Sequence, residues 1–394
     1  MDRFIDRGMK RILIIAIVLL FPLLDALAQT TPPGIIINHS FASSGKYLGS
    51  PSICIMPDGK YIVSHDYFGP QSTEKDAAVT DIFVSEDKGL NWTRISSLKG
   101  QFWSTVFTLK NSLYIFGTYR AHGNIVIRKS DDGGLTWTTP YDGRHGLLFE
   151  GEYHTAPVPV IEYRGRIWKA FEYATAKEPV WPERYSAIVL SASRNSDLLD
   201  SRNWRKSEML ASFRPQLNAN FRGWLEGNIV YDKQQNCLVD ILRVHAPKVN
   251  EEYCAKVRIS CGGRKLKFTK EKDILPFPGG SKKFTIRYDE KTGHYWTLSN
   301  VSDANNLKGI QNDRVRNKLA LCSSEDLIHW EVRKIIIENE DCLKHGFQYA
   351  DWQFDGNDIV AVIRTAFEDE EGEADNYHNS NYIIFKRIEN YNNQ

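Results

Sequence analysis

The sequence lacks an excess of charge of either sign. Its 394 residues include 50 Lys and Arg and 49 Asp and Glu, which gives a formal net charge of +1. A chain without a strongly basic region has no general electrostatic attraction for nucleic acid, so we expect no nucleic-acid partner. Methionine is also scarce, with four residues against 10 Trp, 18 Tyr and 19 Phe. This balance argues against a disordered chain and favours strands with an aromatic binding surface.

Cysteine and acidic patterns typical of metal sites are absent. The six cysteines form no C-x-x-C pair and have no histidine at zinc-like spacing. Cys254 and Cys261 are close enough in sequence to form a disulfide, but we prefer free buried thiols, because a chain of this length does not need disulfides to hold its core. The acidic run at 368–375 lacks the alternating spacing of a calcium loop. We therefore expect no metal and no other cofactor.

Long hydrophobic segments are limited to one run near the amino terminus. Residues 12–24 are apolar, follow Lys10 and Arg11, and precede the small-residue segment 26–28. A basic start, a short apolar run and an A-x-A ending are typical of a secretory signal peptide, and the run is too short for a transmembrane helix. We expect a signal peptide at 1–28, a mature domain at 29–394 without a membrane span, and a secreted or periplasmic protein.

A short motif recurs along the chain. Residues 85–92 and 130–137 both have the pattern S-x-D-x-G-x-x-W, 45 residues apart, while 324–330 is a shortened copy and 197–204 a distorted one. Asp and Gly suit a hairpin turn, Ser and Asp can cap its amides, and Trp can pack between sheets. We therefore interpret the carboxylates of this motif as structural.

The motif belongs to a larger repeated unit of strand, D-G-like turn, strand, loop, strand and motif. Six units are recognisable, and they open near Pro51, Trp103, His154, Trp224, Phe284 and Phe347. The last unit ends at 381–386 without a fourth strand, which residues 34–38 can supply. The pattern predicts an all-β protein, a six-bladed β-propeller closed by that pairing, since closure removes exposed strand edges. A seven-bladed ring is the alternative.

In such a ring, the starts of the inner strands and the loops after the second strands meet at one face around an axial pocket. The positions expected there are rich in arginines, acids and aromatic residues, which is typical of a functional site. They are His65, Asp66, Asp76, Trp103, Tyr119, Arg120, Tyr153, His154, Glu172, Trp224, Glu226, Arg243, Asn300, Arg314, Arg316, His345, Tyr349 and Arg364.

The repeats and this set of residues resemble the sialidases, six-bladed exo-glycosidases that carry such motifs as Asp-boxes. The resemblance implies a Tyr–Glu nucleophile couple, an Asp acid/base in the first unit, and an arginine triad for the sugar carboxylate. Segment 225–243 is similar to the one bearing the family's Glu and second Arg, which implies Glu226 and Arg243. Segment 347–352 is similar to the one bearing its Tyr, which implies Tyr349.

The remaining family positions are matched less closely. Arg316 occupies the place of the third triad Arg, with Arg314 as a competitor, and Asp76 matches the acid/base, with Asp66 as its rival. The family's first triad Arg has no match, because Gly49 stands in its place and glycine cannot grip a carboxylate. Its candidate replacements are Arg120 and Lys46. His65, Trp103 and His154 complete the expected substrate-binding residues.

These observations predict an exported, sialidase-like exo-glycoside hydrolase that removes a terminal acidic sugar from a glycan. A tyrosine nucleophile suits such a sugar, because a carboxylate nucleophile would be repelled by the sugar's own carboxylate. We expect the apolar neighbour Trp224 to make Glu226 more basic. Two alternatives remain: a uronate-directed lyase or His-dependent glycosidase, favoured by His65, His154 and His345, and a non-catalytic glycan-binding propeller.

Overall fold

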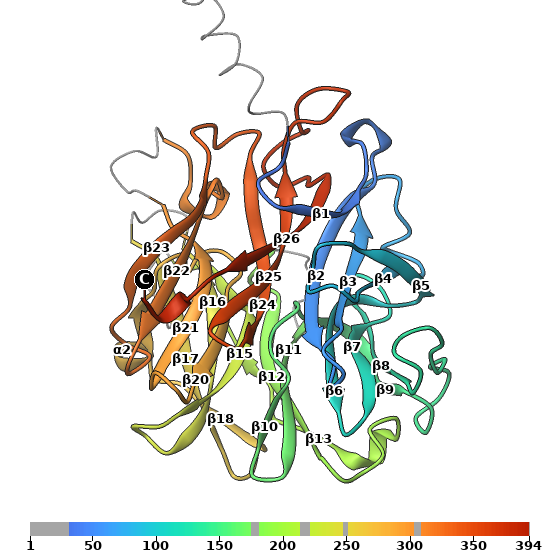
Figure 1. Ribbon diagram of the computed structural model, residues 1–394. Coiled ribbons are helices and arrows are strands. Elements are labelled where there is room, and N and C mark those ends of the chain that lie inside the picture. The colour runs from blue at the N-terminus through green and yellow to red at the C-terminus, as the bar shows by residue number, and fades with distance from the viewer. Residues whose placement is uncertain (1–30, 175–180, 213–220, 247–250, 303–308, 394) are drawn as a thin grey trace, which may run out of the picture.

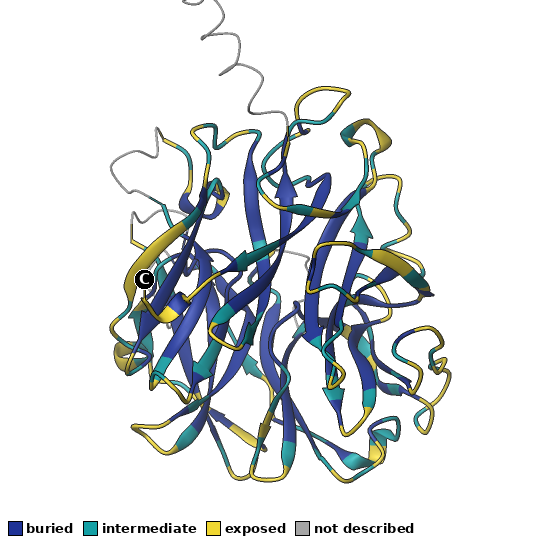
Figure 2. Cartoon of the chain, in the orientation of Figure 1, coloured by how far each residue is buried: buried dark blue, intermediate teal, exposed yellow. Residues whose placement is uncertain are grey.

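The computed structural model describes residues 31–174, 181–212, 221–246, 251–302 and 309–393. The expected signal peptide at 1–28 lies outside the described residues. Antiparallel β-sheets dominate the fold, and the described helices are limited to one short α-helix, α2 (Lys270–Asp273), and single 3-10 turns. Most strand residues are buried, whereas exposed residues concentrate in the loops (Figure 2). This distribution follows from sheets that cover each other on both faces.

Three sheets are built from consecutive strands. One contains β2 (Tyr47–Ile55), β3 (Tyr61–Phe68), β4 (Val79–Ser85) and β5 (Thr93–Lys99). Another contains β15 (Gly223–Asp232), β16 (Cys237–His245), β17 (Tyr253–Ser260), β18 (Lys265–Lys267) and β19 (Ile274–Pro276). The third contains β20 (Thr285–Asp289), β21 (His294–Asn300), β22 (Lys318–Ser324) and β23 (Glu331–Glu338).

A fourth sheet joins the two ends of the chain. It contains β24 (Gly346–Asp355), β25 (Asp358–Ala366), β26 (Tyr382–Ile388) and β1 (Ile35–His39). β1 pairs antiparallel with β26, with Ile35 opposite Phe385 and His39 opposite Tyr382. The predicted pairing of 34–38 with the last strand is therefore present, and Figure 1 shows the amino-terminal strands in blue beside the carboxy-terminal ones in red.

The fifth sheet has nine strands, so the described chain forms five hydrogen-bonded sheets rather than six separate ones. Its strands are β6 (Phe102–Leu109), β7 (Ser112–Thr118), β8 (Gly123–Ser130), β9 (Leu147–His154), β10 (Ile161–Tyr163), β11 (Arg166–Ala174), β12 (Tyr185–Ser193), β13 (Trp204–Lys206) and β14 (Leu210–Ala211). The cause is β9, which pairs with β8 from Leu147 to Tyr153 and with β11 through Tyr153 and His154. One strand thus links two groups of strands that the repeats treat as separate units.

The sheets form a ring, because inner strands of neighbouring groups lie side by side. β2 lies against β6 and β24, β11 lies against β15, and β15 and β24 both lie against β20. Apolar clusters fill the spaces between adjacent sheets; one of them packs Trp168 of β11 against residues of β15 and β16. Stacked sheets arranged in a circle leave an axis lined by the first strands.

The recurring motifs form tight turns at the ends of strands. Ser85 donates to Asp87 and accepts the Gly89 amide at 2.8 Å, and the Trp92 indole donates to the Gly89 carbonyl. The segment 130–137 repeats this network, with the Gly134 amide donating to Ser130 at 2.9 Å. Hydrogen bonds from the side chain and amide of Asn91, and after them from Ser85, lower the pKa of Asp87 to about 2, since they favour the ionised carboxylate. The carboxylates thus hold the turns, as the sequence predicts.

Four of the first strands share a distortion that directs side chains to the axis. Ser50, Trp103, Glu226 and Tyr349 have φ between 44° and 59°, in the left-handed region that non-glycine residues rarely adopt. Each lies at a β-bulge, where the register with the second strand shifts. A bulge turns one side chain out of the normal alternation of the strand. All four residues line the same pocket.

The described residues form neither a disulfide nor a helix that could span a membrane. All six cysteines lie in the described ranges and are free thiols; Cys54, Cys254 and Cys322 are buried, and Cys261 is exposed. The suggested Cys254–Cys261 disulfide is therefore not formed. No helix in the described part of the chain is long and apolar enough to cross a membrane.

Candidate active site

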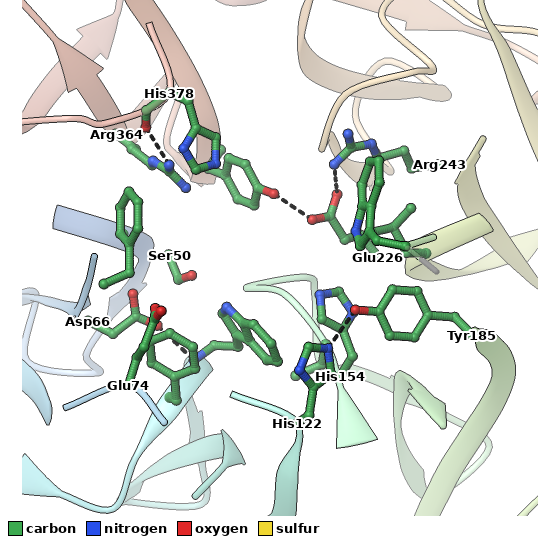
Figure 3. A pocket seen from close by; sticks show the side chains of 18 of the residues that line it. Ser50, Asp66, Glu74, His122, His154, Tyr185, Glu226, Arg243, Arg364 and His378 are labelled. Atoms are coloured by element: carbon green, nitrogen blue, oxygen red, sulfur yellow. Dashed lines mark hydrogen bonds and ion pairs between the residues drawn. The ribbon is translucent and has the colours of Figure 1, made fainter. Parts of the chain in front are cut away.

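An axial pocket of about 450 Å³ opens where the bulged strands meet. Figure 3 shows that acids, arginines and histidines surround it, with Asp66 and Glu74 on one side and Glu226 and Arg243 on the other. The residues that line it are Gly49, Ser50, Asp66, Phe68, Glu74, Phe102, Trp103, His122, His154, Thr155, Trp181, Tyr185, Leu225, Glu226, Arg243, Asp313, Arg316, Tyr349, Arg364, Tyr377 and His378. Residues far apart in the sequence thus meet in one polar cavity.

Tyr349, Glu226 and Arg243 form a hydrogen-bonded chain across the pocket. The Tyr349 hydroxyl donates to Glu226 Oε1 at 2.7 Å, and Arg243 Nη1 donates to Glu226 Oε2 at 2.9 Å. Arg243 is held in turn by the Ser281 carbonyl, which accepts from its Nε at 2.8 Å. Glu226 and Arg243 are buried, so both orientations are fixed before any ligand binds. The structure therefore brings together the tyrosine and glutamate that the resemblance pairs.

The electrostatics of this chain differ from the prediction in one respect. Burial favours the neutral acid, but the charge of Arg243, and after it the interaction with His154, holds the pKa of Glu226 below its usual value. Trp224, expected to make Glu226 more basic, lies in the apolar core between sheets and does not line the pocket. Burial raises the pKa of Tyr349, and the charge of Glu226 adds to this. At rest the pair is thus a neutral phenol and a carboxylate.

Two further arginines lie beside Tyr349. Arg316 donates from Nε to the Asp313 carbonyl at 3.0 Å and from Nη1 to the Gln348 side chain, and Arg364 donates from Nε to Ser380 at 3.0 Å. Their guanidinium carbons are 5.9 Å and 4.9 Å from the Tyr349 ring centre. Arg243 Nη2 has no hydrogen-bond partner among the described residues. The pocket therefore presents three buried cations with capacity left for an anionic ligand.

The arginine that joins Arg243 and Arg316 is Arg364, which was expected at the pocket face but not as the replacement for the family's first triad arginine. Gly49 lines the pocket, but a Cβ added there would lie 2.6 Å from Asp66 Oδ1 and 3.0 Å from the Phe68 ring. An arginine in the family's place therefore does not fit. Arg364 of β25 takes this side of the pocket, and its guanidinium carbon lies 4.3 Å from the centre of the Phe68 ring. Of the proposed replacements, Lys46 and Arg120 are exposed, and Arg120 donates to the Lys75 carbonyl at 2.9 Å.

Asp66, rather than Asp76, is the aspartate in the pocket. Asp66 Oδ2 accepts the Trp103 amide at 2.7 Å, while Oδ1 has no hydrogen-bond partner among the described residues. Burial raises the pKa of Asp66 to about 7 and outweighs the opposing effects of the Trp103 amide and Arg364. Asp76 is exposed and does not line the pocket, because the loop it shares with Glu74 turns Glu74 inward.

Other expected residues lie outside the pocket. His65 is buried in the sheet, where Asn38 bonds it at 2.9 Å and Phe83 stacks on it. Arg314 is exposed, which leaves Arg316 as the arginine of that segment in the site. His345 is paired with Glu368 at 2.9 Å and does not line the pocket. The alternation of a strand explains His65, since its neighbour Asp66 takes the position facing the axis.

A second wall of the pocket is aromatic and rich in histidine. His154 Nδ1 lies 2.7 Å from Glu172 Oε2, and His122 Nε2 lies 2.7 Å from the Tyr185 hydroxyl. Trp103 packs edge-on against His154, with ring centres 4.4 Å apart. Burial lowers the pKa of His122 to about 3, so this ring is neutral at physiological pH. Trp103 and His154 are thus in the pocket, as expected.

Sequence reasoning missed several residues of the site, among them Glu74, His122, Trp181, Tyr185, Tyr377 and His378. His122 lies in the loop between β7 and β8, and loops after second strands are expected at the pocket face. Its position in the sequence could therefore have identified it. Trp181 is 44 % exposed at the rim, and its ring lies 5.7 Å from the Arg243 guanidinium. No group of three or more His, Cys, Asp or Glu side chains suited to a metal ion occurs among the described residues.

Comparisons with known proteins identify the architecture. No protein-family model matches the sequence, and no curated protein matches it. Among solved structures, the chain is similar to an α-L-arabinanase of Penicillium chrysogenum, with 12 % identity, a TM-score of 0.56, and coverage of 90 % of this chain and 97 % of that one. The chain folds as a β-propeller.

Sialidase propellers are among the other matches. A Hadza microbial sialidase gives a TM-score of 0.58 at 12 % identity, with 90 % of this chain and 68 % of that one covered. The Trypanosoma rangeli sialidase gives 0.55 at 11 %, with 87 % of this propeller and 55 % of that chain covered. At these identities the likeness concerns the fold.

Proposed function

We propose that the protein is an exported exo-glycoside hydrolase of the sialidase type, which removes a terminal acidic sugar from a glycan. The observation that carries the proposal is the Tyr349–Glu226–Arg243 chain, flanked by two more buried arginines and facing Asp66, whose pKa burial raises to about 7, across the pocket. Similar propellers include sialidases, which supports the same chemistry. The proposal includes counting the nine-stranded sheet as two blades, for a ring of six with Asp-box turns.

In the first step, Tyr349 Oη attacks the anomeric carbon as the bond to the leaving oxygen breaks. Glu226 takes the phenol proton, and Asp66 gives its proton to the leaving oxygen. Arg243, Arg316 and Arg364 hold the anionic group of the sugar. A neutral phenol avoids the repulsion that a carboxylate nucleophile would meet beside that group.

In the second step, water attacks the anomeric carbon and displaces the Tyr349 oxygen. Asp66, now ionised, takes a proton from this water, and Glu226 returns its proton to the phenol. The pKa near 7 suits Asp66 to both tasks, because a group that acts first as acid and then as base works best near its own pKa.

The resting pKa values oppose proton transfer from Tyr349 to Glu226, so transfer must accompany attack. The positive charge developing on the sugar is what makes it favourable, since an oxocarbenium-like centre attracts the phenolate as it forms. The three arginines also favour the phenolate, and their charges oppose the effect of burial on the pKa of Tyr349. The site therefore stabilises charge that exists only during reaction.

A substrate screen tests the proposal. Purified protein from Gln29 onward is incubated with sialosides, uronate-capped oligosaccharides and α-L-arabinofuranosides, and product masses are recorded. We expect a water-added product, with the free acidic sugar released from the chain end. Cleavage of arabinofuranosides alone would show that the substrate carries a neutral terminal sugar and not an acidic one. An arabinanase is among the proteins of similar fold.

The histidine wall favours a second candidate, a lyase acting on uronates. Its pair of His154 with Glu172 is suited to removing a proton beside a carboxylate, whereas burial leaves His122 too weakly basic for that task. A product with a new double bond in the same screen would support it. Saturable binding without any product would indicate a glycan-binding propeller instead.

A further inference from the structure

His154 and Glu172 form a buried pair that the hydrolysis above does not use. They lie directly opposite each other on β9 and β11, and Glu172 is fully buried. Glu172 Oε2 lies 2.7 Å from His154 Nδ1, and Glu172 Oε1 accepts the Gly227 amide at 3.2 Å. Both oxygens are therefore engaged, and the hydrogen bond from the Gly227 amide fixes the Glu172 carboxyl group so that its second oxygen faces His154.

The geometry around Gly227 keeps this arrangement rigid. A Cβ added to Gly227 would lie 2.2 Å from Asp240 Oδ1, so the backbone there packs tightly against Asp240. Burial, and after it the charge of Glu172, raises the pKa of Asp240 well above its usual value. Burial thus disfavours the ionised form of Asp240, while Glu172 is the acid that faces the histidine.

A carboxylate accepts hydrogen bonds, so the hydrogen in this pair is carried by His154 Nδ1. In the neutral ring, Nε2 then has a lone pair. The structure shows no hydrogen bond to Nε2 from a described residue, and His154 lines the pocket beside Glu226 and His122 (Figure 3). The wall around it is aromatic, with Trp103 and Tyr185 at ring-centre distances of 4.4 Å and 4.7 Å.

We propose that Glu172 is a positioning residue that fixes His154 with Nε2 facing the pocket, where it accepts the hydrogen of a substrate hydroxyl. This inference rests on the proposed function and adds a second requirement to the substrate. The arginines select an anionic group, and His154 selects a free hydroxyl on the uncharged part of the sugar. A substrate methylated or deoxygenated there leaves a buried acceptor unpaired, which costs affinity.

The tautomer of His154 gives a test that needs no substrate. Protonated and unprotonated imidazole nitrogens differ strongly in ¹⁵N chemical shift, and the signals of His154 are assigned by their loss in His154→Gln. In the ligand-free protein, at a pH where the ring is neutral, we expect a protonated Nδ1 and an unprotonated Nε2. In Glu172→Gln, whose amide can donate to Nδ1, we expect the opposite tautomer to become populated. A protonated Nε2 in the unaltered neutral ring would overturn the proposal.

Kinetics test the role of the pair in turnover. Glu172→Gln should lower kcat/KM by about 10- to 100-fold, the loss typical when the partner that orients a metal-binding histidine is removed. The double variant with His154→Gln should lose little more than His154→Gln alone, since Glu172 acts through that ring. Glu162→Gln is the matched control, because Glu162 is a half-exposed residue of β10 paired with Arg194 at 2.7 Å.

The outcomes separate this inference from the proposed function. An unchanged kcat/KM in folded Glu172→Gln, or additive losses in the double variant, would contradict the positioning role while leaving the hydrolase intact. If no glycoside is cleaved, the proposed function fails, and the tautomer measurement still decides the orientation of His154. If Glu172→Gln does not fold, the spectrum of the unaltered protein decides it alone.

Discussion

Replacing Asp66 with Asn should abolish turnover and stabilise the protein. Asp66 is 2 % exposed, and burial raises its pKa from 3.8 to about 7. In the unfolded chain the carboxyl ionises near 3.8, so between these values the folded protein binds more protons than the unfolded one. Stability therefore falls as the pH rises from about 4 to about 7, and the loss is complete above 7. At about 1.4 kcal/mol per pH unit, the interval corresponds to roughly 4 kcal/mol.

An asparagine at 66 carries no charge and can still accept the Trp103 amide. At pH 8 we expect the free energy of unfolding of Asp66→Asn, measured by denaturant titration, to exceed that of the unaltered protein by up to roughly 4 kcal/mol. At pH 4 we expect the two proteins to have similar free energies of unfolding. Turnover should fall by at least about a hundredfold, as expected for loss of a general acid. In the unaltered protein, kcat/KM should decline above pH 7, because the acid must be protonated.

Asp76→Asn provides the matched comparison, since Asp76 is exposed and lies in the neighbouring loop. We expect it to retain activity and to show no pH-dependent gain in stability. If Asp76→Asn is inactive while Asp66→Asn is active, the acid is the residue that the family resemblance selects and not the one the pocket contains. Equal stability of Asp66→Asn and the unaltered protein at pH 8 would refute the argument from burial.

Three further predictions follow from other contacts. Tyr349→Phe and Glu226→Gln should each lower kcat by at least about a hundredfold, and the double variant should lose little more, because the two act as a unit; near-additive losses would contradict this. Asp240→Asn should raise the melting temperature more at pH 8 than at pH 5, since a buried carboxyl with a raised pKa destabilises the fold as the pH rises; an equal change at both pH values would argue against it. Removing residues 29–40 takes away β1, so the protein should melt earlier than the mature chain in calorimetry; an unchanged melting temperature would show that closure by β1 is dispensable.

The sequence by itself determined the strands, the turns and the closing pair. Alternating apolar residues and Asp–Gly turns are local signals, since side chains on a strand alternate faces and certain turns require particular residues. The pairing of 34–38 with the last strand followed from a missing strand in the last repeat, and it is present. Glu226 and Tyr349 could be paired because both open a first strand, and such positions meet at the axis.

Only the tertiary structure decided which residues complete the pocket. The choice of Asp66 over Asp76 depends on how one loop turns, and the choice of Arg364 depends on the space between Gly49, Asp66 and Phe68. The bulges at Trp103 and Tyr349 contain no glycine, and in the third the left-handed residue is Glu226 rather than its neighbour Gly227. Such features are set by contacts between strands from distant parts of the chain, where burial also fixes each pKa. The sequence pattern identifies candidate residues for this site, but the packing of the sheets in the ring determines which of them face one another.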